Sequence, residues 1–490
     1  MRKQAISSVV VAGGGIVGWS TAAALRRRLP MLDVRVVPIK PPVDSLADRI
    51  GCTLPSIVEF NHDLGLSEAD AVIRAGSGYR LGTRFEGWAK GAPYVQAYGE
   101  YGGPAGGVAF HQHWLRAGAE AGPFGSFSFA ATMAAAERFA PPEATAAGSF
   151  GYGFHIDPTN YCEMMRAFAL HLGATEHRGE IERVALRDDG FIGALALADG
   201  ANLAADLFID ATGPEALVRG EMGGQRENWG RFFVTDRLLM GEARTPANPS
   251  PVDRVTARDW GWQWEADSPR RRSFGLVYSS RHLDDSESAN MLGEASAEPT
   301  SAAIELHPGR LAEPWLRNCV AIGDASVAIE PLEWTNLHLA LSAMDRIIAM
   351  MPDRDCSAVE LWDYNRQATA EADRVRDFVM LHYVVAERPG EFWREASSVP
   401  LPDSLEHTLT QFRERGRLPF FEEETFARDS WLAVLLGQGV RPRRLDPLLD
   451  AIPAAESERL LTQIRTAIAT ATERLPSRSE YLHNLARETQ

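Results

Sequence analysis

A glycine-rich turn near the start of the chain restricts the fold more than any other feature. Gly13, Gly15 and Gly18 form the pattern G-x-G-x-x-G between an apolar β-branched run at 9–12 and an alanine-rich run at 19–25. This order is typical of a strand, a tight turn and a helix, in which the glycines allow a diphosphate to approach the backbone closely. Free N–H groups at the helix N-terminus would bind that diphosphate. For this motif alone, a glycine-rich turn that binds nothing is the alternative.

Composition and charge exclude several classes of protein. The 490 residues carry a formal net charge of -16, so the overall field repels phosphate polymers and we exclude nucleic-acid binding. Lysine accounts for three of the 50 basic residues (Lys3, Lys40 and Lys90) and arginine for the other 47, so a surface arginine is not informative. Four widely spaced cysteines without a C-x-x-C pair indicate free thiols and a cytoplasmic protein. We expect neither a signal peptide nor a membrane span.

Two later segments resemble the remaining cofactor-binding parts of flavoproteins with two dinucleotide-binding domains. Strands are predicted at 181–186, 191–196 and 203–209, and the last leads into Asp-Ala-Thr-Gly at 210–213. A further buried strand ends in Gly-Asp at Asp324, where related flavoproteins hold the ribityl chain and the diphosphate. Together with the first turn, these segments predict a discontinuous FAD-binding domain.

Segments spread along most of the chain resemble the flavin-dependent tryptophan halogenases. The similarity is carried by residues 46–56, 76–88, 98–102, 110–116, 154–157, 260–267, 318–325, 329–338, 364–366, 377–383 and 430–439. Trp262 and Trp264 keep the tryptophans of the family's W-x-W-x-I-P signature, while Ala266 and Asp267 replace its Ile-Pro pair. So many matches make chance a poor explanation.

The resemblance implies an enzyme that oxidises a halide through a flavin C4a-hydroperoxide, and the cofactor itself supplies that chemistry. In the family, hypohalous acid passes through a tunnel to a lysine beside the substrate, where a glutamate assists electrophilic aromatic substitution. The implied halide is chloride or bromide. The implied reductant is FADH2 from a separate flavin reductase, because the sequence has no second G-x-G-x-x-G for a nicotinamide.

Glu333 and Arg80 are the implied catalytic residues. Glu333 matches the family's glutamate, and an ordinary ion pair at a helix start is its alternative role. Arg80 stands where the family has its lysine. A guanidinium stays protonated, so it can donate hydrogen bonds to hypohalous acid but is a poor nucleophile for forming a haloamine. We therefore expect Arg80→Lys to preserve or raise halogenation.

Thr335 and Asn336 match the Thr-Gly pair whose backbone N–H groups hold the halide in the family. Trp334 replaces a small serine that links the flavin site to the tunnel. The loss of glycine restricts the backbone, and the tryptophan adds bulk where a channel is expected. We therefore expect a weakened halide site.

The resemblance also implies residues that contact the substrate and the flavin. The family's His-x-Phe clamp corresponds to Gln96-Ala97-Tyr98, in which Tyr98 keeps a ring for stacking and Gln96 is alternatively a plain surface residue. The implied substrate contacts are Gln96, Tyr98 and Trp431. The implied FAD contacts are Gly13, Gly15, Ile16, Val17, Gly18, Cys52, Val184, Asp324 and Leu337.

We predict no metal site. His111 and His113 form an H-x-H pair, but no carboxylate or cysteine at ligand spacing accompanies them. We interpret them as core or solvated histidines.

The predicted architecture is an α/β protein with a Rossmann-like FAD-binding fold, a mixed substrate sheet and a C-terminal helical cap. The FAD-binding module spans 1–345 (mainly 1–60, 150–220 and 305–345), the interleaved substrate-facing sheet takes 61–149 and 221–304, and the helical cap takes 346–490. The leading hypothesis is halogenation of an indole or another electron-rich aromatic. The alternatives are a flavin monooxygenase that uses no halide and a flavin-binding protein without turnover. The sequence leaves a homodimer open.

Overall fold

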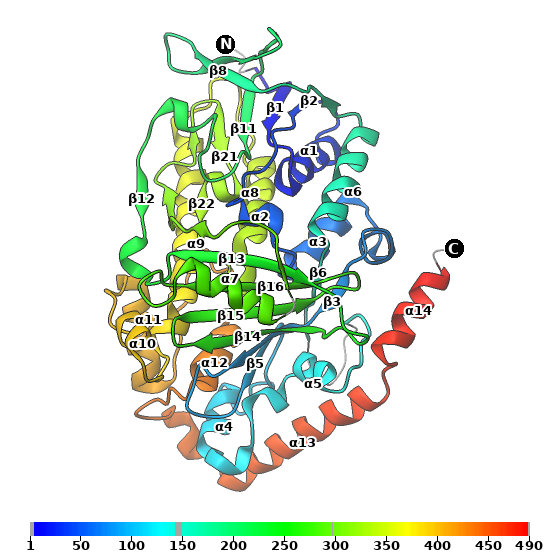
Figure 1. The fold of residues 1–490 in the computed structure, drawn as a ribbon. Helices are drawn as coiled ribbons and strands as arrows, with labels where there is room; N and C mark the ends of the chain where they lie inside the picture. Colours follow the sequence, from blue (N-terminus) through cyan, green and yellow to red (C-terminus); the bar gives the residue numbers. More distant parts are fainter. Residues whose placement is uncertain (1–3, 143–148, 296, 489–490) are drawn as a thin grey trace. The chain divides into compact units, whose positions relative to one another are not determined.

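The computed structural model describes residues 4–142, 149–295 and 297–488, and Figure 1 shows its helices and strands. The chain divides into two compact units, each built from segments that alternate along the sequence. Unit one comprises Met1–Ser77, Ile156–Arg231 and Ser301–Asp373, and unit two comprises Gly78–His155, Phe232–Thr300 and Arg374–Gln490. Among the described residues, no helix has the length and apolar character needed to cross a membrane.

The central sheet of unit one has the strand order β20-β21-β11-β1-β2-β7. All neighbours pair in parallel except β20, which runs antiparallel to β21. The bounds are β1 Ser8–Ala12, β2 Asp33–Val37, β7 Thr175–Glu176, β11 Leu207–Asp210, β20 Trp315–Leu316 and β21 Cys319–Ala321. Parallel strands covered on both faces are apolar throughout, which explains the continuous apolar run in β1. The sheet confirms the predicted Rossmann-like fold.

Helices cover this sheet, and α1 packs against both α6 and α8. The bounds are α1 Ile16–Arg28, α2 Leu46–Arg49, α3 Ser56–Leu64, α6 Pro158–His171 and α8 Thr335–Ala349. The start of α6 follows from its sequence, because Asp157 accepts a hydrogen bond from the N–H of Asn160 at 3.1 Å and Pro158 opens the helix. The first part of α9, Ala358–Val384, also belongs to this unit.

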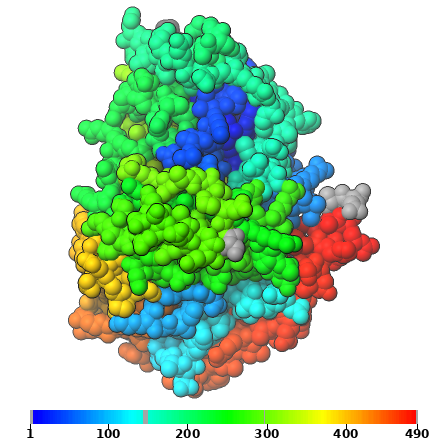
Figure 2. Space-filling view, in the orientation of Figure 1, coloured from blue at the N-terminus to red at the C-terminus, as the bar shows by residue number. Residues whose placement is uncertain are grey.

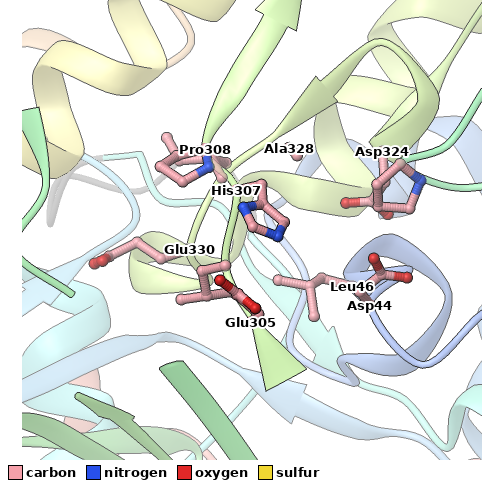
Figure 3. A pocket seen from close by; sticks show the side chains of 11 residues that line it. Asp44, Leu46, Glu305, His307, Pro308, Asp324, Ala328 and Glu330 are labelled. Atoms are coloured by element: carbon pink, nitrogen blue, oxygen red, sulfur yellow. The ribbon is translucent and has the colours of Figure 1, made fainter. Parts of the chain in front are cut away.

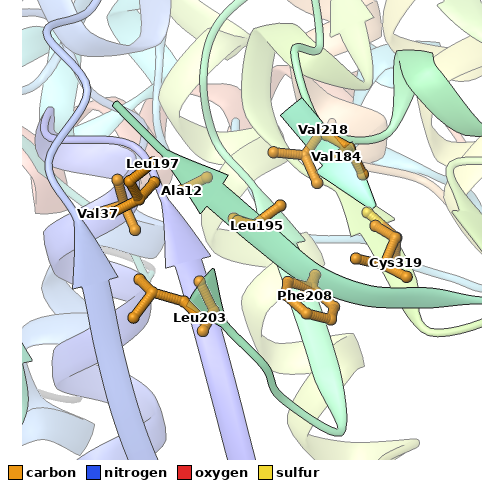
Figure 4. Close-up of a cluster of buried hydrophobic side chains, with 11 residues drawn as sticks. Ala12, Val37, Val184, Leu195, Leu197, Leu203, Phe208, Val218 and Cys319 are labelled. Atoms are coloured by element: carbon orange, nitrogen blue, oxygen red, sulfur yellow. The ribbon is translucent and has the colours of Figure 1, made fainter. Parts of the chain in front are cut away.

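Two small sheets complete unit one. The first consists of β8 Ile181–Leu186, β9 Ile192–Leu197 and β10 Asn202–Leu203. The second consists of β12 Arg226–Asn228, β19 Gly309–Leu311 and β22 Val327–Ala328. Figure 4 shows how Leu195 and Leu197 of the first small sheet pack toward Ala12, Val37 and Phe208 of the central sheet. This apolar cluster packs the first small sheet against the central sheet.

The single strand predicted at 203–209 is wrong, because the chain forms two strands there. β10 ends at Leu203 and β11 begins at Leu207. The side chain of Asp206 accepts hydrogen bonds from the N–H groups of Ser7 and Ser8, at 2.9 and 3.1 Å. These bonds hold the link beside the start of β1, so it cannot continue the strand.

Unit two is built on a mixed sheet with the strand order β17-β13-β16-β15-β14-β4-β5. β14 and β4 pair in parallel, and the other neighbours are antiparallel. The bounds are β4 Gly82–Glu86, β5 Tyr94–Ala97, β13 Arg237–Ala243, β14 Val252–Arg258, β15 Gly261–Asp267, β16 Arg272–Tyr278 and β17 Glu298–Pro299. Arg254 and Glu265 form an ion pair on β14 and β15. The segment that contains β13 to β16 forms the green surface in Figure 2.

In the sequence, the helices of unit two lie between strands of this sheet and after its last strand. They are α4 Phe110–Ala117, α5 Phe129–Ala135, α7 Asp285–Glu294, the end of α9, α10 Glu391–Ala396, α11 Asp403–Arg415, α12 Arg428–Gly437, α13 Ala454–Glu473 and α14 Arg478–Glu488. Unit two also contains an antiparallel pair of short strands, β3 Gly78–Arg80 and β6 Gly153–His155. The region after residue 346 is helical, as predicted.

Trp262 and Trp264 on β15 are both buried, and each indole N–H has a hydrogen-bond partner. Nε1 of Trp262 donates to the hydroxyl of Tyr383 at 2.7 Å, and Nε1 of Trp264 donates to the hydroxyl of Ser273 at 3.2 Å. Gly275, opposite Trp264 on β16, leaves room for its ring. The pair therefore packs the core of unit two.

We expect Gly275→Ala to destabilise the protein. The new Cβ would lie 1.9 Å from Cη2 of Trp264, and overpacking of this kind costs about 1–3 kcal/mol. Gly293→Ala in α7 is the control, because a Cβ there meets no atom within 4 Å. Chemical denaturation should show a lower midpoint for the first variant and no loss for the second. An unchanged midpoint for Gly275→Ala would contradict the packing described.

Candidate active site

The turn between β1 and α1 has no room for side chains at two of its glycines. A Cβ on Gly13, whose φ is +144°, would lie 2.4 Å from the carbonyl oxygen of Ala211. A Cβ on Gly18 would lie 2.1 Å from the carbonyl oxygen of Gly13. The helix therefore packs directly on the turn and on the end of the neighbouring strand, as the motif requires.

The N-terminus of α1 holds an anionic group of the protein itself. The N–H of Val17 donates to Oδ1 of Asp48 at 2.9 Å, and the N–H of Ile16 bonds to the same carboxylate. A Cβ on Gly15 would lie 2.2 Å from that oxygen. The carboxylate of Asp48 occupies the position at which a helix N-terminus binds phosphate. These residues therefore fit a diphosphate that displaces Asp48.

Acidic groups surround the adjoining part of this site. Asp324 follows β21 and accepts a hydrogen bond from the N–H of Ala47 at 2.8 Å. Figure 3 shows a small cavity beside it, with Asp44 and His307 also in its wall. Burial raises the pKa of Asp324 to about 8 and the pKa of Asp48 to about 6. Carboxyl groups accept hydrogen bonds from sugar hydroxyls, which fits a ribityl chain near Asp324.

The segment that leads into α8 is strained. Glu333 and Trp334 are buried and have φ angles of +69° and +61°, which residues with side chains rarely adopt. Asn336 lies within α8, and its Nδ2 donates to the carbonyl oxygen of Ile329 at 3.0 Å. The backbone strain therefore falls on Glu333 and Trp334, and not on Asn336. Strained residues of this kind persist where the surrounding structure enforces them, often at functional sites.

Thr335 is fully buried at the start of α8. Its hydroxyl has no hydrogen-bond partner among the residues that the structure describes. The first N–H groups of a helix also lack partners within the helix. A buried hydroxyl without a partner is costly, so an anion bound here would satisfy groups that the protein leaves open.

Arg80, at the end of β3, lies in a buried ion pair of unit two. Its Nε donates to Oδ1 of Asp253 at 2.8 Å, and its Nη2 donates to Oδ2 at 2.7 Å. Nη2 also donates to the hydroxyl of Thr83, which donates to Asp253. Nε2 of His155 lies 2.5 Å from Oδ1 of the same carboxylate. Burial alone would raise the pKa of Asp253, but Arg80 and His155 hold it well below its usual range.

Sequence reasoning missed Asp253 and gave no role to His155. The inward-facing residues of β14 are Asp253, Val255 and Ala257, so the sequence does contain a signal. A carboxylate at an inward position of an otherwise apolar strand face needs a buried partner. His155 reaches the same carboxylate because β6 pairs with β3, which carries Arg80.

Gln96 and Tyr98 border this ion pair. Gln96 lies opposite Thr83 in the β4–β5 pair, so their side chains share one face of the sheet. Within the described chain, neither the amide of Gln96 nor the hydroxyl of Tyr98 has a hydrogen-bond partner, and both residues are buried. The guanidinium of Arg80 lies 5.1 Å from the centroid of the Tyr98 ring. Burial excludes the surface alternative for Gln96, and the open polar atoms fit a bound ligand.

Trp431 lies in the wall of a cavity of about 330 Å³ in unit two. The helix that carries it, α12, packs on β5, which carries Gln96. The guanidinium of Arg374 lies 4.6 Å from the centroid of the Trp431 ring and 3.8 Å from that of Phe421. Glu424 balances this charge at 2.7 Å. Aromatic walls and a neutralised cation suit a small aromatic ligand.

The histidines of the H-x-H pair bond to protein groups. His111 Nε2 lies 2.7 Å from the carbonyl oxygen of Gly416, and His113 Nδ1 lies 2.6 Å from the hydroxyl of Ser457. Both rings are buried, and desolvation lowers the pKa of each, that of His111 to about 4. They stabilise the packing of α4 as neutral core residues.

Comparison with known proteins decides the family. The model of the tryptophan halogenase family matches residues 8–454. This chain belongs to that family. Tryptophan 6-halogenase ThaL of Streptomyces albogriseolus is 26% identical over 531 residues, which cover 98% of each chain. The chain is therefore an enzyme, a flavin-dependent oxidoreductase, and the recognition made from its motifs is confirmed.

Solved structures agree with this assignment. BrvH, a flavin-dependent halogenase from Brevundimonas sp. BAL3, is 35% identical with a TM-score of 0.91, covering 98% of this chain and 99% of BrvH. Xcc4156, a flavin-dependent halogenase from Xanthomonas campestris, is 33% identical with a TM-score of 0.92 over the same shares. The fold of the halogenase family thus extends over nearly the whole chain.

The two units of this halogenase-family chain divide the predicted site residues between them. Unit two carries Arg80, Gln96, Tyr98 and Trp431. Unit one carries Gly13, Gly15, Ile16, Val17, Gly18, Cys52, Val184, Asp324, Glu333, Thr335, Asn336 and Leu337. Cys52 and Leu337 are buried, and the side chain of Val184 packs in the apolar cluster of Figure 4. Any contact of Val184 with a cofactor therefore comes from its backbone.

We expect Gly15→Val to lower the affinity for FAD by about tenfold or more. The added side chain would fill the space that Asp48 occupies and a diphosphate would need, and overpacking costs about 1–3 kcal/mol. Gly91→Val is the control, because a Cβ there meets no atom within 4 Å. Quenching of flavin fluorescence measures both affinities. Wild-type affinity in the Gly15 variant would show that the diphosphate binds elsewhere.

We expect the flavin-free protein to lose stability as the pH rises from about 4 to about 8. The pKa of Asp324 is 3.8 when unperturbed and about 8 in the fold, so the unfolded chain ionises this group first as the pH rises. Below pH 3.8 the group is protonated in both states and contributes nothing. Asp324→Asn removes the effect and should flatten the decline in melting temperature between pH 5 and pH 8. An equal decline in both proteins would contradict the raised pKa.

Proposed function

We propose that this enzyme halogenates an electron-rich aromatic compound, such as an indole, with chloride or bromide and FADH2. The observation that carries the proposal is the buried Arg80 guanidinium beside the open polar atoms of Gln96 and Tyr98. A charged donor in a site closed to water suits a small neutral oxidant such as hypohalous acid. The relatives support an indole, since ThaL is named a tryptophan 6-halogenase.

FAD is the cofactor we assign to unit one. Its diphosphate would displace Asp48 from the N–H groups of Ile16 and Val17, and its ribityl hydroxyls would bond to Asp324. Cys52 and Leu337 would contact other parts of the cofactor. Bound reduced flavin supplies the oxygen-activating chemistry that oxidises the halide. The halide would bind at Thr335 and Asn336, where the Thr335 hydroxyl and the first N–H groups of α8 would donate hydrogen bonds to it.

The substrate ring would lie against Tyr98 and Trp431, with Gln96 bonding to its polar edge. Arg80 would hold the hypohalous acid by hydrogen bonds. Glu333 would accept the proton that leaves the ring carbon when the carbon–halogen bond forms. It would then pass this proton to the hydroxide released from the hypohalous acid, so that one water molecule and the halogenated ring result. Confinement matters because free hypohalite attacks methionines and amines.

The reductase and the location belong to the same proposal. A separate flavin reductase would supply FADH2, since the chain has one G-x-G-x-x-G motif. Cytoplasmic location is supported by the four cysteines, because none of them forms a disulfide bond.

Product analysis tests the proposal. Purified enzyme would receive FAD, a flavin reductase with NADH, oxygen, bromide and a panel of indoles and phenols, and mass spectrometry would search for the isotope pair of bromine. We expect brominated product that depends on bromide. A hydroxylated product formed equally well without halide would show a monooxygenase instead.

We expect Glu333→Gln to slow halogenation by about 100-fold or more while flavin affinity stays unchanged. Loss of a positioned acid–base group commonly costs about 10²–10⁴ in rate. Glu182→Gln on β8 is the control, because this glutamate is exposed in the same unit. Turnover of the Glu333 variant within about threefold of wild type would remove this residue from the mechanism.

A further inference from the structure

Asp253 lies within a buried cluster of side chains from four strands. Its partners come from β3, β4 and β6, and it belongs to β14. Arg80 and Asp253 are fully buried, and the exposed fraction of His155 is 2%. Solvent therefore screens the charges of this cluster much less than it screens a surface ion pair.

The charges of Arg80 and Asp253 compensate each other in the protein interior. The two parallel hydrogen bonds, at 2.8 and 2.7 Å, are the fork arrangement in which arginine and carboxylate pair most strongly. Loss of either partner would leave one buried charge without compensation. As long as Asp253 is ionised, it favours the protonated form of any base at position 80. Arginine, the residue present at this position, is protonated at any working pH.

The other groups around Arg80 do not replace this influence. In the described part of unit two, His155 and Tyr98 are titratable groups that contact Arg80 or Asp253. His155 contacts the carboxylate of Asp253, so it shares that charge with Arg80. Tyr98 presents its ring to the guanidinium, and Thr83 contributes a neutral hydroxyl. Of these groups, the carboxylate of Asp253 carries the negative charge that favours a protonated base at position 80.

We propose that Asp253 is a positioning residue that holds the Arg80 guanidinium in one orientation and would keep any base at position 80 protonated, so that the enzyme uses hydrogen-bonded hypohalous acid. The proposal rests on the proposed halogenation. The covalent alternative joins a neutral amine and hypohalous acid, forms a nitrogen–halogen bond and releases water, and it needs the lone pair of the nitrogen. A protonated base offers no lone pair, so Arg80 closes this route by itself, and Asp253 would close it for a lysine at the same position.

This assignment changes the expectation for a lysine at position 80. The sequence alone predicts that Arg80→Lys preserves or raises halogenation. Beside Asp253, the new amine would remain an ammonium group and would not form a haloamine. A neutral amine requires the second change, Asp253→Asn, which keeps the size of the side chain but removes its charge.

The protonation of the introduced lysine tests the proposal without any turnover. Arg80→Lys and Arg80→Lys/Asp253→Asn would be labelled with ¹³C-lysine and titrated by NMR, with Lys3, Lys40 and Lys90 as internal references. We expect the pKa of the introduced amine to be about 1–3 units lower in the double variant, because the opposite charge is gone. Equal pKa values in the two variants would overturn the proposal.

Denaturation covers the case in which a lysine variant does not fold. Arg80→Met, Asp253→Asn and the double variant form a cycle, in which we expect the double variant to unfold at higher denaturant than Asp253→Asn alone. Arg254→Met, Glu265→Gln and their double variant form the control cycle. This ion pair lies on the same sheet but is more exposed, with 45% of the Arg254 side chain and 17% of the Glu265 side chain open to solvent. Coupling no larger than in the control cycle would contradict the proposed dependence.

Halogenation assays separate this proposal from the proposed function. If the wild type makes no halogenated product, the function fails, whereas the NMR titration and the denaturation cycle still decide the role of Asp253. If the wild type is active, Arg80→Lys/Asp253→Asn should exceed Arg80→Lys in halogenation. The reverse order would count against Asp253 as the group that selects the route.

Discussion

The close contact of the β1–α1 turn with the end of β11 is the constraint on which unit one depends. Gly13 meets the backbone of Ala211, and Gly18 meets the backbone of Gly13, so no other residue type fits at either point. The same close packing directs the first N–H groups of α1 toward one anion-binding position. Asp48 now fills that place, which makes the cofactor site a consequence of strand and helix packing.

Buried charge is handled differently in the two units. In unit one, burial raises the pKa of the Asp48 and Asp324 carboxyls. Both accept hydrogen bonds from backbone N–H groups, which a bound cofactor would use instead. In unit two, Arg80 and Asp253 neutralise each other within hydrogen-bond distance. The first arrangement suits exchange with a ligand, and the second suits a fixed cation. Both follow from the cost of an uncompensated charge in a protein interior.

Features that depend on neighbouring residues were predictable from the sequence. The β1–α1 turn and the strand at 181–186 appear at the predicted positions, because periodicity and glycine spacing are local signals. The break between β10 and β11 depends on Asp206 bonding to Ser7 and Ser8, far away in sequence. Asp253 was missed for the same reason, since the pairing of β14 with β4 places it opposite Thr83, three residues after Arg80. Alignment with the family placed Arg80, but it could not show what partner an arginine would require there.

The most direct test of the account compares halogenation and flavin binding in the same protein. Arg80→Met/Asp253→Asn removes both charges of the buried pair together, so the interior keeps no uncompensated charge. The account predicts that this variant binds FAD with wild-type affinity and makes no halogenated product. Halogenation at the wild-type rate, with FAD affinity unchanged, would show that the buried pair of unit two plays no part in handling the oxidant.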